Sequence, residues 1–186
     1  MWYNKYSKNK TPYTGGDKSK MDKQTIIIGV DDTILKSTEQ INKQLQVFPD
    51  YITPLLYESN AFLYNVSKYE GFDEFLNKFQ SQFNIVLLTK GTSTNINKKV
   101  SYLFPLPVYD IPPNTPKSAI IFPNTYLAID SNITHLQEIN SPAKILFNPK
   151  TPPPPNSNIY TASSWYDVID MIEFDNYLRK EGIILG

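Results

Sequence analysis

The chain has 186 residues, of which 40% are hydrophobic and 19% charged, the proportions of a globular protein with a core of its own. Its 18 basic and 18 acidic side chains cancel, so no global charge favours binding to nucleic acid or to a membrane surface. The absence of cysteine excludes disulfides, thiolate nucleophiles and thiolate metal sites.

Residues 1–23 carry six lysines against Asp17 and Asp22, a local balance of +4, and show no hydrophobic periodicity. This composition predicts a flexible basic tail. The tail also holds aromatic side chains that are able to dock in a partner's groove or to stack on bases, namely Trp2, Tyr3, Tyr6 and Tyr13. We therefore expect a protein partner for the tail, with nucleic acid as the less favoured alternative. No apolar stretch resembles a signal peptide or a membrane span, so we expect no membrane association and a cytoplasmic location.

A short apolar run at residues 25–30 ends abruptly in Asp31, Asp32 and Thr33. Consecutive apolar, β-branched residues are typical of a strand that is buried on both faces of a parallel sheet. Ligands bind just beyond the carboxyl ends of such strands. The sequence thus predicts that these three polar residues lie at the mouth of a site.

The next segment, residues 36–70, has hydrophobic residues at helical spacing. Ser37 and Thr38 are suitable N-cap residues, and Pro49 would end a first helix. The apolar positions are Ile41, Leu45, Phe48, Ile52, Leu55, Leu56, Phe62, Leu63 and Val66. We expect a small helical cap insertion that closes over the site, or else helices that simply pack on the sheet.

A helix is predicted over residues 71–83, because Phe72, Phe75, Leu76 and Phe79 form one apolar stripe. A strand over 85–88 follows and ends at Thr89 and Lys90. Another helix is expected over 92–103. Five prolines between positions 105 and 116 then predict an irregular path around a short strand near 108–111, which leads to Lys117.

Residues 126–130 form a further apolar run, which ends in Asp130 and Ser131. A short helix over 133–139 carries His135, the only histidine, which we expect on the surface. A strand over 143–147, a polyproline-like loop at 152–155 and a final helix that opens at Trp165 complete the chain.

The residues around the first strand resemble motif I of the haloacid-dehalogenase (HAD) superfamily of phosphatases, a hydrophobic strand followed by Asp-x-Asp-x-Thr. Aligned on Thr33, Asp31 matches the second aspartate of that motif, the family's general acid/base. Gly29 then stands where the family has its nucleophilic aspartate. The resemblance implies a phosphatase relative that lacks the group that attacks phosphorus.

Three later residues resemble the remaining HAD motifs in their order along the chain. Thr89 matches the hydroxyl that holds a phosphate oxygen, and Lys117 matches the motif lysine, although a surface lysine is the alternative. Asp130 matches the first acid of the metal-binding pair, whereas Ser131 replaces the second. The resemblance implies phosphate binding by Asp32, Thr33, Thr89, Lys90 and Lys117. It also implies a weakened Mg²⁺ site at Asp31 and Asp130.

Three sequences are similar to the 5′(3′)-deoxyribonucleotidase branch of the superfamily. They are Tyr-Glu-Gly-Phe-Asp-Glu-Phe-Leu at 69–76, Ile-Leu-Phe-Asn-Pro at 145–149 and Ser-Ser-Trp-Tyr-Asp-Val-Ile at 163–169. The resemblance covers about residues 24–175 and implies a three-layer α/β/α Rossmann-like fold with a central parallel sheet. The expected domains are the flexible tail, 1–23, and a HAD-like domain, 24–186, with the small helical cap at 36–70.

These expectations favour a catalytically degenerate HAD-type nucleotidase homologue that binds a protein partner, a nucleotide or a phosphate group. The alternative is an active Mg²⁺-dependent nucleotidase or phosphatase on (deoxy)nucleoside monophosphates, with Asp31 as acid/base. A structural component of a phage or polymerase assembly is a second alternative. The excess of lysine over arginine, of which Arg179 is the only example, indicates an AT-rich bacterial or phage genome. A phage protein would then work in the host cytoplasm.

Overall fold

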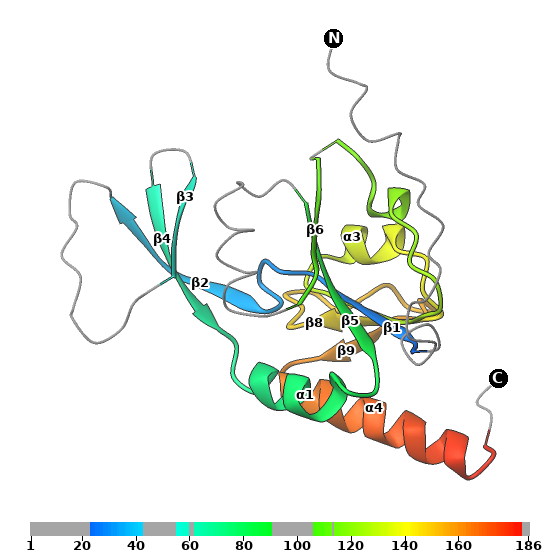
Figure 1. Cartoon of the computed structure of the whole chain (residues 1–186). Coiled ribbons are helices and arrows are strands. Elements are labelled where there is room, and N and C mark those ends of the chain that lie inside the picture. The colour runs from blue at the N-terminus through cyan, green and yellow to red at the C-terminus, as the bar shows by residue number, and fades with distance from the viewer. Residues whose placement is uncertain (1–22, 43–54, 60–61, 91–105, 113, 184–186) are drawn as a thin grey trace, which may run out of the picture.

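The computed structural model describes residues 23–42, 55–59, 62–90, 106–112 and 114–183. Its centre is a six-stranded sheet of parallel strands in the order β6-β5-β1-β7-β8-β9 (Figure 1). These strands are β1 (Thr25–Ile28), β5 (Asn84–Lys90), β6 (Val108–Ile111), β7 (Thr125–Asp130), β8 (Ala143–Phe147) and β9 (Tyr160–Ala162). The predicted fold class, helices around a central parallel sheet, is confirmed.

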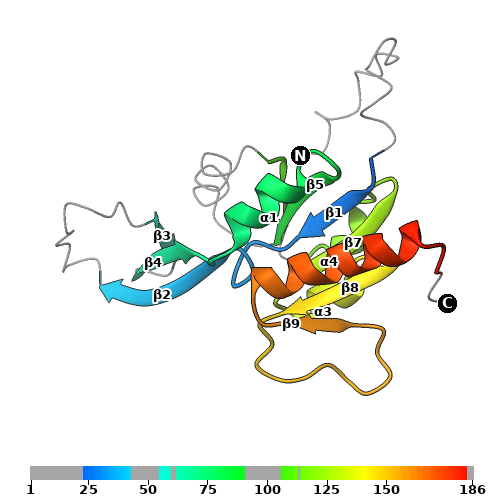
Figure 2. The same cartoon turned by 90° about the horizontal axis from the view of Figure 1, so that it is seen from below.

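Helices lie on both faces of this sheet, which makes three layers. α1 (Phe72–Phe79) and α4 (Trp165–Lys180) cover one face, and α3 (Ile133–Glu138) covers the other (Figures 1 and 2). The alternation of side chains along β1 explains the two cores. Ile26 and Ile28 pack in the cluster that contains α1 and α4, whereas Ile27 packs in the cluster with α3. Because both faces are covered, every residue of β1 is buried.

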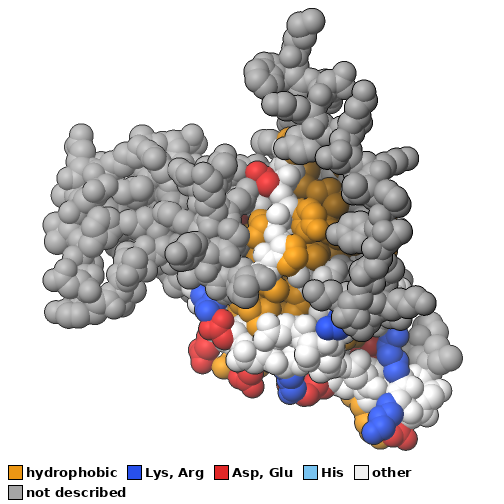
Figure 3. Space-filling model, viewed as in Figure 1, with side chains coloured by type: hydrophobic (Ala, Val, Ile, Leu, Met, Phe, Trp, Pro, Cys, Tyr) orange, Lys and Arg blue, Asp and Glu red, His pale blue; other side chains and the backbone are white. Residues whose placement is uncertain are grey.

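The apolar stripe predicted for α1 is buried as expected, although the helix ends at Phe79 and not near residue 83. Phe83 stays in the core after the helix has ended, because the turn that follows carries it back to the sheet. α4 begins at a capping box in which Ser164 and Asp167 satisfy each other's main-chain N–H groups. Charged side chains of α1 and α4 gather along one edge of the molecule, and Lys78 forms an ion pair with Glu173 at 2.5 Å (Figure 3).

The insertion after β1 contains a small sheet, so the prediction of a helical cap at 36–70 is wrong for the described residues. β2 (Leu35–Asn42), β3 (Leu55–Ser59) and β4 (Phe62–Lys68) pair in antiparallel fashion in the order β2-β4-β3. The sequence itself explains why this segment forms strands and not helices. Phe62, Tyr64 and Val66 recur at every second position, and aromatic and β-branched residues favour pleated strands. The apparent helical spacing arose because apolar residues that belong to different strands were counted as one series.

The small sheet begins where the loop after β1 ends. Leu35 pairs with Lys68, and the Tyr69 N–H extends this pairing by donating to the Ile34 oxygen at 2.9 Å. Figure 1 shows the small sheet standing to one side of the main sheet, beyond the carboxyl end of β1. A small antiparallel sheet therefore occupies the place in the chain where a helical cap was expected.

The later strands of the main sheet follow the sequence prediction except for β9. β6 and β8 are confirmed within their predicted ranges, and β9 was not predicted because only three residues form it. The helix predicted over 92–103 and the aromatic tail lie outside the described residues. In the part of the chain that the structure describes, no helix combines the length and apolarity that crossing a membrane requires.

Candidate functional site

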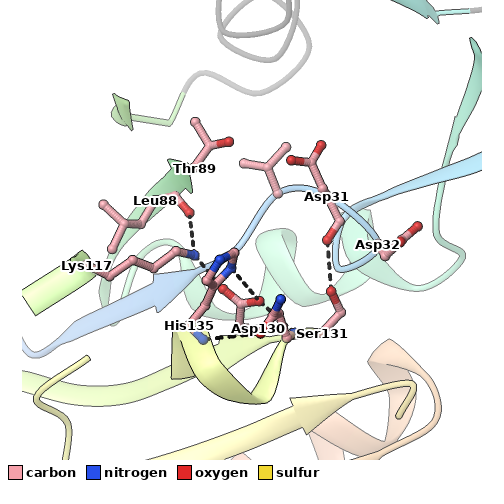
Figure 4. Close-up of a pocket in the computed structure, with 10 residues that line it drawn as sticks. Asp31, Asp32, Leu88, Thr89, Lys117, Asp130, Ser131 and His135 are labelled. Carbon is pink, nitrogen blue, oxygen red and sulfur yellow. Dashed lines mark hydrogen bonds and ion pairs between the residues drawn. The ribbon is translucent and has the colours of Figure 1, made fainter. Parts of the chain in front are cut away.

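The chain passes from β1 to β5 and β6 on one side and then returns to β7 on the other side of β1. Ligands of open parallel sheets bind at such a switch point, beyond the carboxyl ends of the strands. A cavity of about 150 Å³ lies there (Figure 4). Its lining consists of Val30, Asp31, Asp32, Leu88, Thr89, Lys117, Asp130, Ser131, Asn132 and His135.

The cavity brings together most of the predicted site residues from distant parts of the chain. Asp31, Asp32, Thr89, Lys117 and Asp130 all line it. Two predicted phosphate ligands are not among its lining residues. Thr33 belongs to the loop after β1 and is fully buried, and the side chain of Lys90 lies outside the described part of the structure.

Gly29 does not line this cavity, but it lies directly against the carboxyl group of Asp130, which does. A Cβ atom built on Gly29 would be 2.6 Å from Asp130 Oδ2 and 2.7 Å from its Cγ. Real side chains do not approach so closely. The space that a side chain at residue 29 would need is therefore filled by the carboxylate of Asp130 from β7.

The partner of that carboxylate is Lys117, whose side chain is buried to the same degree. Lys117 Nζ donates to Asp130 Oδ2 at 2.5 Å and to the main-chain oxygen of Leu88 at 3.2 Å. The lysine reaches this position because it opens the short 3₁₀ helix η3 (Lys117–Ala119), and its own N–H is held by Glu138 Oε2 at 2.8 Å. The alternative that Lys117 is an ordinary surface lysine is wrong.

The loop after β1 is held in place by hydrogen bonds. Thr33 Oγ1 accepts from the Ser131 N–H at 2.9 Å and donates to the Asp31 oxygen at 3.3 Å. Ser131 Oγ donates to the same Asp31 oxygen at 2.9 Å, and the indole of Trp165 donates to the Thr33 oxygen at 3.0 Å. Thr33 thus positions the loop and joins it to β7.

Main-chain N–H groups in this loop would be natural phosphate ligands, but four of them already donate to main-chain oxygens of the loop and its ends. The N–H groups of Thr33, Ile34 and Leu35 all donate to the Val30 oxygen, at 3.0–3.3 Å. The Asp32 N–H donates to the Leu35 oxygen at 2.8 Å. The donors of this cavity are therefore mostly side chains.

The surroundings of Asp31 alter the protonation of its carboxyl group. The walls of the cavity remove water from its carboxyl group and raise its pKa from 3.8 to about 6, although its outer side reaches solvent. The negative charges of Asp32 and Asp130 add to this effect, and the ammonium of Lys117 opposes it. Asp31 can therefore gain or lose a proton near neutral pH.

The site also contains a residue that sequence reasoning assigned to the surface. His135 is half-buried and lines the cavity, with Nδ1 3.9 Å from Asp130 Oδ1. It lies in the first turn of α3, which begins directly after the carboxyl end of β7 and is capped by Asn132. The sequence held one signal for this position. Only two residues separate Asp130, at the end of β7, from the helix that carries His135, so the first turn of that helix has to lie near the end of β7.

Mg²⁺ is the metal implied by the resemblance, and the donors present do not fit it. Mg²⁺ requires near-octahedral oxygen ligands at about 2.0–2.1 Å, usually including one or two carboxylates. Gly29 offers no side-chain oxygen, and both oxygens of Asp130 accept hydrogen bonds, from Lys117 and from the Asn132 N–H at 2.8 Å. Among the described residues, no three acidic or histidine side chains converge on one point.

A second, larger cavity of about 740 Å³ adjoins the first and shares Asp32, Ser131 and Asn132 with it. It runs past Tyr69, Asn148 and Lys150, at the carboxyl end of β8. Asn148 Nδ2 donates to the Tyr69 hydroxyl at 3.2 Å, which joins its two sides. The two cavities together are large enough for a group that extends beyond a phosphate.

Comparison with known proteins agrees with this architecture. No curated protein matches the chain. Residues 24–112 match the family model described as NIF, NLI interacting factor-like phosphatase. The matched segment runs from β1 through the small sheet to β6 and is slightly less than half of the chain. This part of the protein is therefore similar to a HAD-like phosphatase family.

Proposed function

We propose that the chain is a catalytically degenerate relative of HAD-type phosphatases, which acts by binding and not by hydrolysis. The observation that carries this proposal is the contact between Gly29 and Asp130. The position aligned with the nucleophile has no side chain, and a Cβ there would lie 2.6 Å from Asp130 Oδ2. A nucleophile cannot enter from residue 29 unless Asp130 leaves.

The expected loss of rate is large. Removal of the nucleophile from a hydrolase that forms a covalent intermediate costs on the order of 10⁶ in kcat, as for the catalytic serine of subtilisin. At about 1.4 kcal/mol for each factor of ten, this is roughly 8 kcal/mol of transition-state stabilisation. Asp31 remains in the cavity, but an acid/base group alone contributes only about 10²–10⁴.

A protein partner is the ligand class that the charges of the cavity favour. Lys117 is neutralised by Asp130, and the N–H groups of Thr33, Ile34 and Leu35 are bonded inside the loop. Among the residues that the structure describes, few donors are left for a phosphate dianion, and Asp31 and Asp32 repel it. A nucleotide is the second ligand class, with its phosphate near Thr89 and its nucleoside in the larger cavity.

One observation favours the alternative, an active Mg²⁺-dependent phosphatase on nucleoside monophosphates. The raised pKa of Asp31, about 6, suits a group that transfers protons near neutral pH. In this alternative a water molecule would attack directly. A third candidate, a scaffold in a phage or polymerase assembly, rests on the basic aromatic tail of the sequence.

The test is release of phosphate from deoxynucleoside monophosphates and from an aryl phosphate, with and without Mg²⁺. We expect no release above the background of an Asp31→Asn variant. Asp170→Asn, a substitution of an exposed residue on α4 that lines neither cavity, controls for preparation and charge. A kcat on the order of 1 s⁻¹ or more that is lost in Asp31→Asn and kept in Asp170→Asn would overturn the proposal.

A further inference from the structure

A buried ammonium group is bonded to the Asp130 carboxylate, the acid that a divalent cation in this pocket would need as a ligand. Lys117 Nζ contacts Asp130 Oδ2 at 2.5 Å and the Leu88 oxygen at 3.2 Å, between the carboxyl ends of β7 and β5. We infer that Lys117 takes the place of the divalent metal in this chain and that the pocket does not take up Mg²⁺. The inference rests on the proposed function, in which the site is degenerate.

The first support is that the oxygens a metal would use are already bonded. Asp130 Oδ2 accepts from Lys117 and Asp130 Oδ1 accepts from the Asn132 N–H. The main-chain oxygen of Asp31 accepts from the hydroxyl groups of Ser131 and Thr33. A metal ion would have to displace several of these hydrogen bonds at once, and Gly29 would contribute no carboxylate in return.

The second support is that Lys117 cannot move aside at low cost. Its side chain is 2% exposed, its N–H is bonded to Glu138, and its ammonium group also satisfies the Leu88 oxygen. A divalent ion on Asp130 would stand beside this ammonium group in a site with little water. Like charges at such a distance repel strongly where the dielectric constant is low.

The third support links this ion pair to the missing nucleophile. Asp130 can lie against residue 29 only because residue 29 is glycine, since a Cβ would be 2.6 Å from Oδ2. A carboxylate on residue 29 would push Asp130 away from Lys117 and add a second acid beside it. The absence of the nucleophile and the absence of a metal site are therefore one structural change.

Mn²⁺ is a suitable probe because free Mn²⁺ is measured directly by electron paramagnetic resonance. We expect the native chain to leave the free Mn²⁺ signal unchanged at equimolar, submillimolar concentrations. Lys117→Met leaves the buried Asp130 carboxylate without a cation, so we expect this variant to bind Mn²⁺ at least about tenfold more tightly than the native chain. Its unfolding temperature should also rise when Mn²⁺ is added.

Lys144→Met is the matched control. It removes the same charge from β8, where Lys144 donates to the Gln137 oxygen and does not line the cavity. We expect no gain of Mn²⁺ binding in this variant. Should Lys117→Met fail to fold, Lys117→Gln removes the charge and keeps a donor for the Leu88 oxygen, and the titration of the native chain needs no variant.

Two results would overturn the inference: micromolar binding of Mn²⁺ by the native chain, or no gain in either Lys117 variant. Neither result touches the proposed function if phosphate release stays absent. Conversely, phosphate release that persists in EDTA would overturn the proposed function, but it would not contradict the inference that the pocket takes up no divalent metal. The two proposals can therefore fail separately.

Discussion

The indole N–H of Trp165 donates a hydrogen bond to the main-chain oxygen of Thr33, 3.0 Å away. This bond joins the first residue of α4 to the loop that follows β1, 132 positions earlier in the chain. The indole ring is fully buried against Phe72 and Phe75 of α1 and against Phe147 at the end of β8. The last helix thus positions the loop that carries Asp31.

Trp165→Phe should destabilise the fold by about 1–3 kcal/mol, because the buried Thr33 oxygen loses its donor and a small void replaces part of the ring. Urea denaturation measures the change. Tyr166→Phe on the next residue is the control. Because Tyr166 is exposed, this substitution should change the free energy of unfolding by no more than about 0.5 kcal/mol. Equal effects of the two substitutions would show that the indole hydrogen bond contributes nothing.

Gly29→Asp should lower the unfolding temperature and should not create phosphatase activity. The new Cβ would meet Asp130 Oδ2 at 2.6 Å, and the new carboxylate would repel that of Asp130. Gly29→Ala introduces the same Cβ without the charge, so the difference between the two variants isolates the repulsion.

The double variant Gly29→Asp/Asp130→Gly tests the cause, because it returns one carboxylate to the site and removes the obstruction. We expect it to be more stable than Gly29→Asp alone. Thermal unfolding of the four proteins, native and variants, measures this. If Gly29→Asp were as stable as the native chain, Asp130 would have to move freely, contrary to its buried ion pair.

The outcome at this site marks the limit of what the sequence predicted. Buried strands that end in polar residues correctly placed Asp31, Thr89 and Asp130 at one edge of the sheet, because carboxyl ends of parallel strands meet. The contact between Gly29 and Asp130 was not predictable. It depends on the rotamer of a side chain a hundred positions away, which no local pattern encodes.

Errors elsewhere have similarly physical causes. The sequence predicts helices in place of the small sheet because a 3.6-residue period fits apolar residues that belong to different strands, whereas Phe62, Tyr64 and Val66 of β4 follow the two-residue period. The expectation of a surface position for His135 has a different cause. The sequence predicts the helix that carries His135, but it does not predict the direction in which that helix leaves β7.

Lys117→Met should destabilise the fold by about 3–5 kcal/mol in metal-free buffer, because it leaves the buried carboxylate of Asp130 without a partner. Denaturant titration measures the loss. The double variant Lys117→Met/Asp130→Leu removes both charges, and it should recover most of the stability since a buried pair can be replaced by apolar groups. A double variant no more stable than Lys117→Met would contradict this account.

Gly71→Ala should destabilise the fold by more than Gly182→Ala. Both glycines have left-handed backbone angles, φ +84° and +72°, so alanine costs about 1–2 kcal/mol at either position. At Gly71 the added Cβ also lies 3.1 Å from Trp165 Cβ, whereas nothing lies within 4 Å at Gly182. The difference in unfolding free energy between the two variants reports the packing of α1 against α4. Identical losses of stability in the two variants would show that Trp165 moves aside for the added Cβ without cost.

The stability of the fold should depend on pH through Asp31. Its pKa is about 6 in the folded chain and near 3.8 in the unfolded chain, so between these values the folded state keeps a proton that the unfolded state has lost. The contribution of Asp31 is therefore fully present below about pH 3.8 and is lost as the pH rises through about 6. Asp31→Asn stays neutral throughout, so the native chain should lose stability relative to this variant across that window.

Urea denaturation of both proteins from about pH 4 to about pH 7 gives this difference directly. Asp32→Asn is the informative second variant, because the charge of Asp32 is the largest electrostatic contribution that raises the pKa of Asp31. Its removal should move the window to lower pH. Asparagine tolerates the left-handed conformation of residue 32, φ 53°, so the loop should keep its shape. A native-minus-Asp31→Asn difference that stays constant with pH would mean that the carboxyl group of Asp31 is as well hydrated in the folded chain as in the unfolded one.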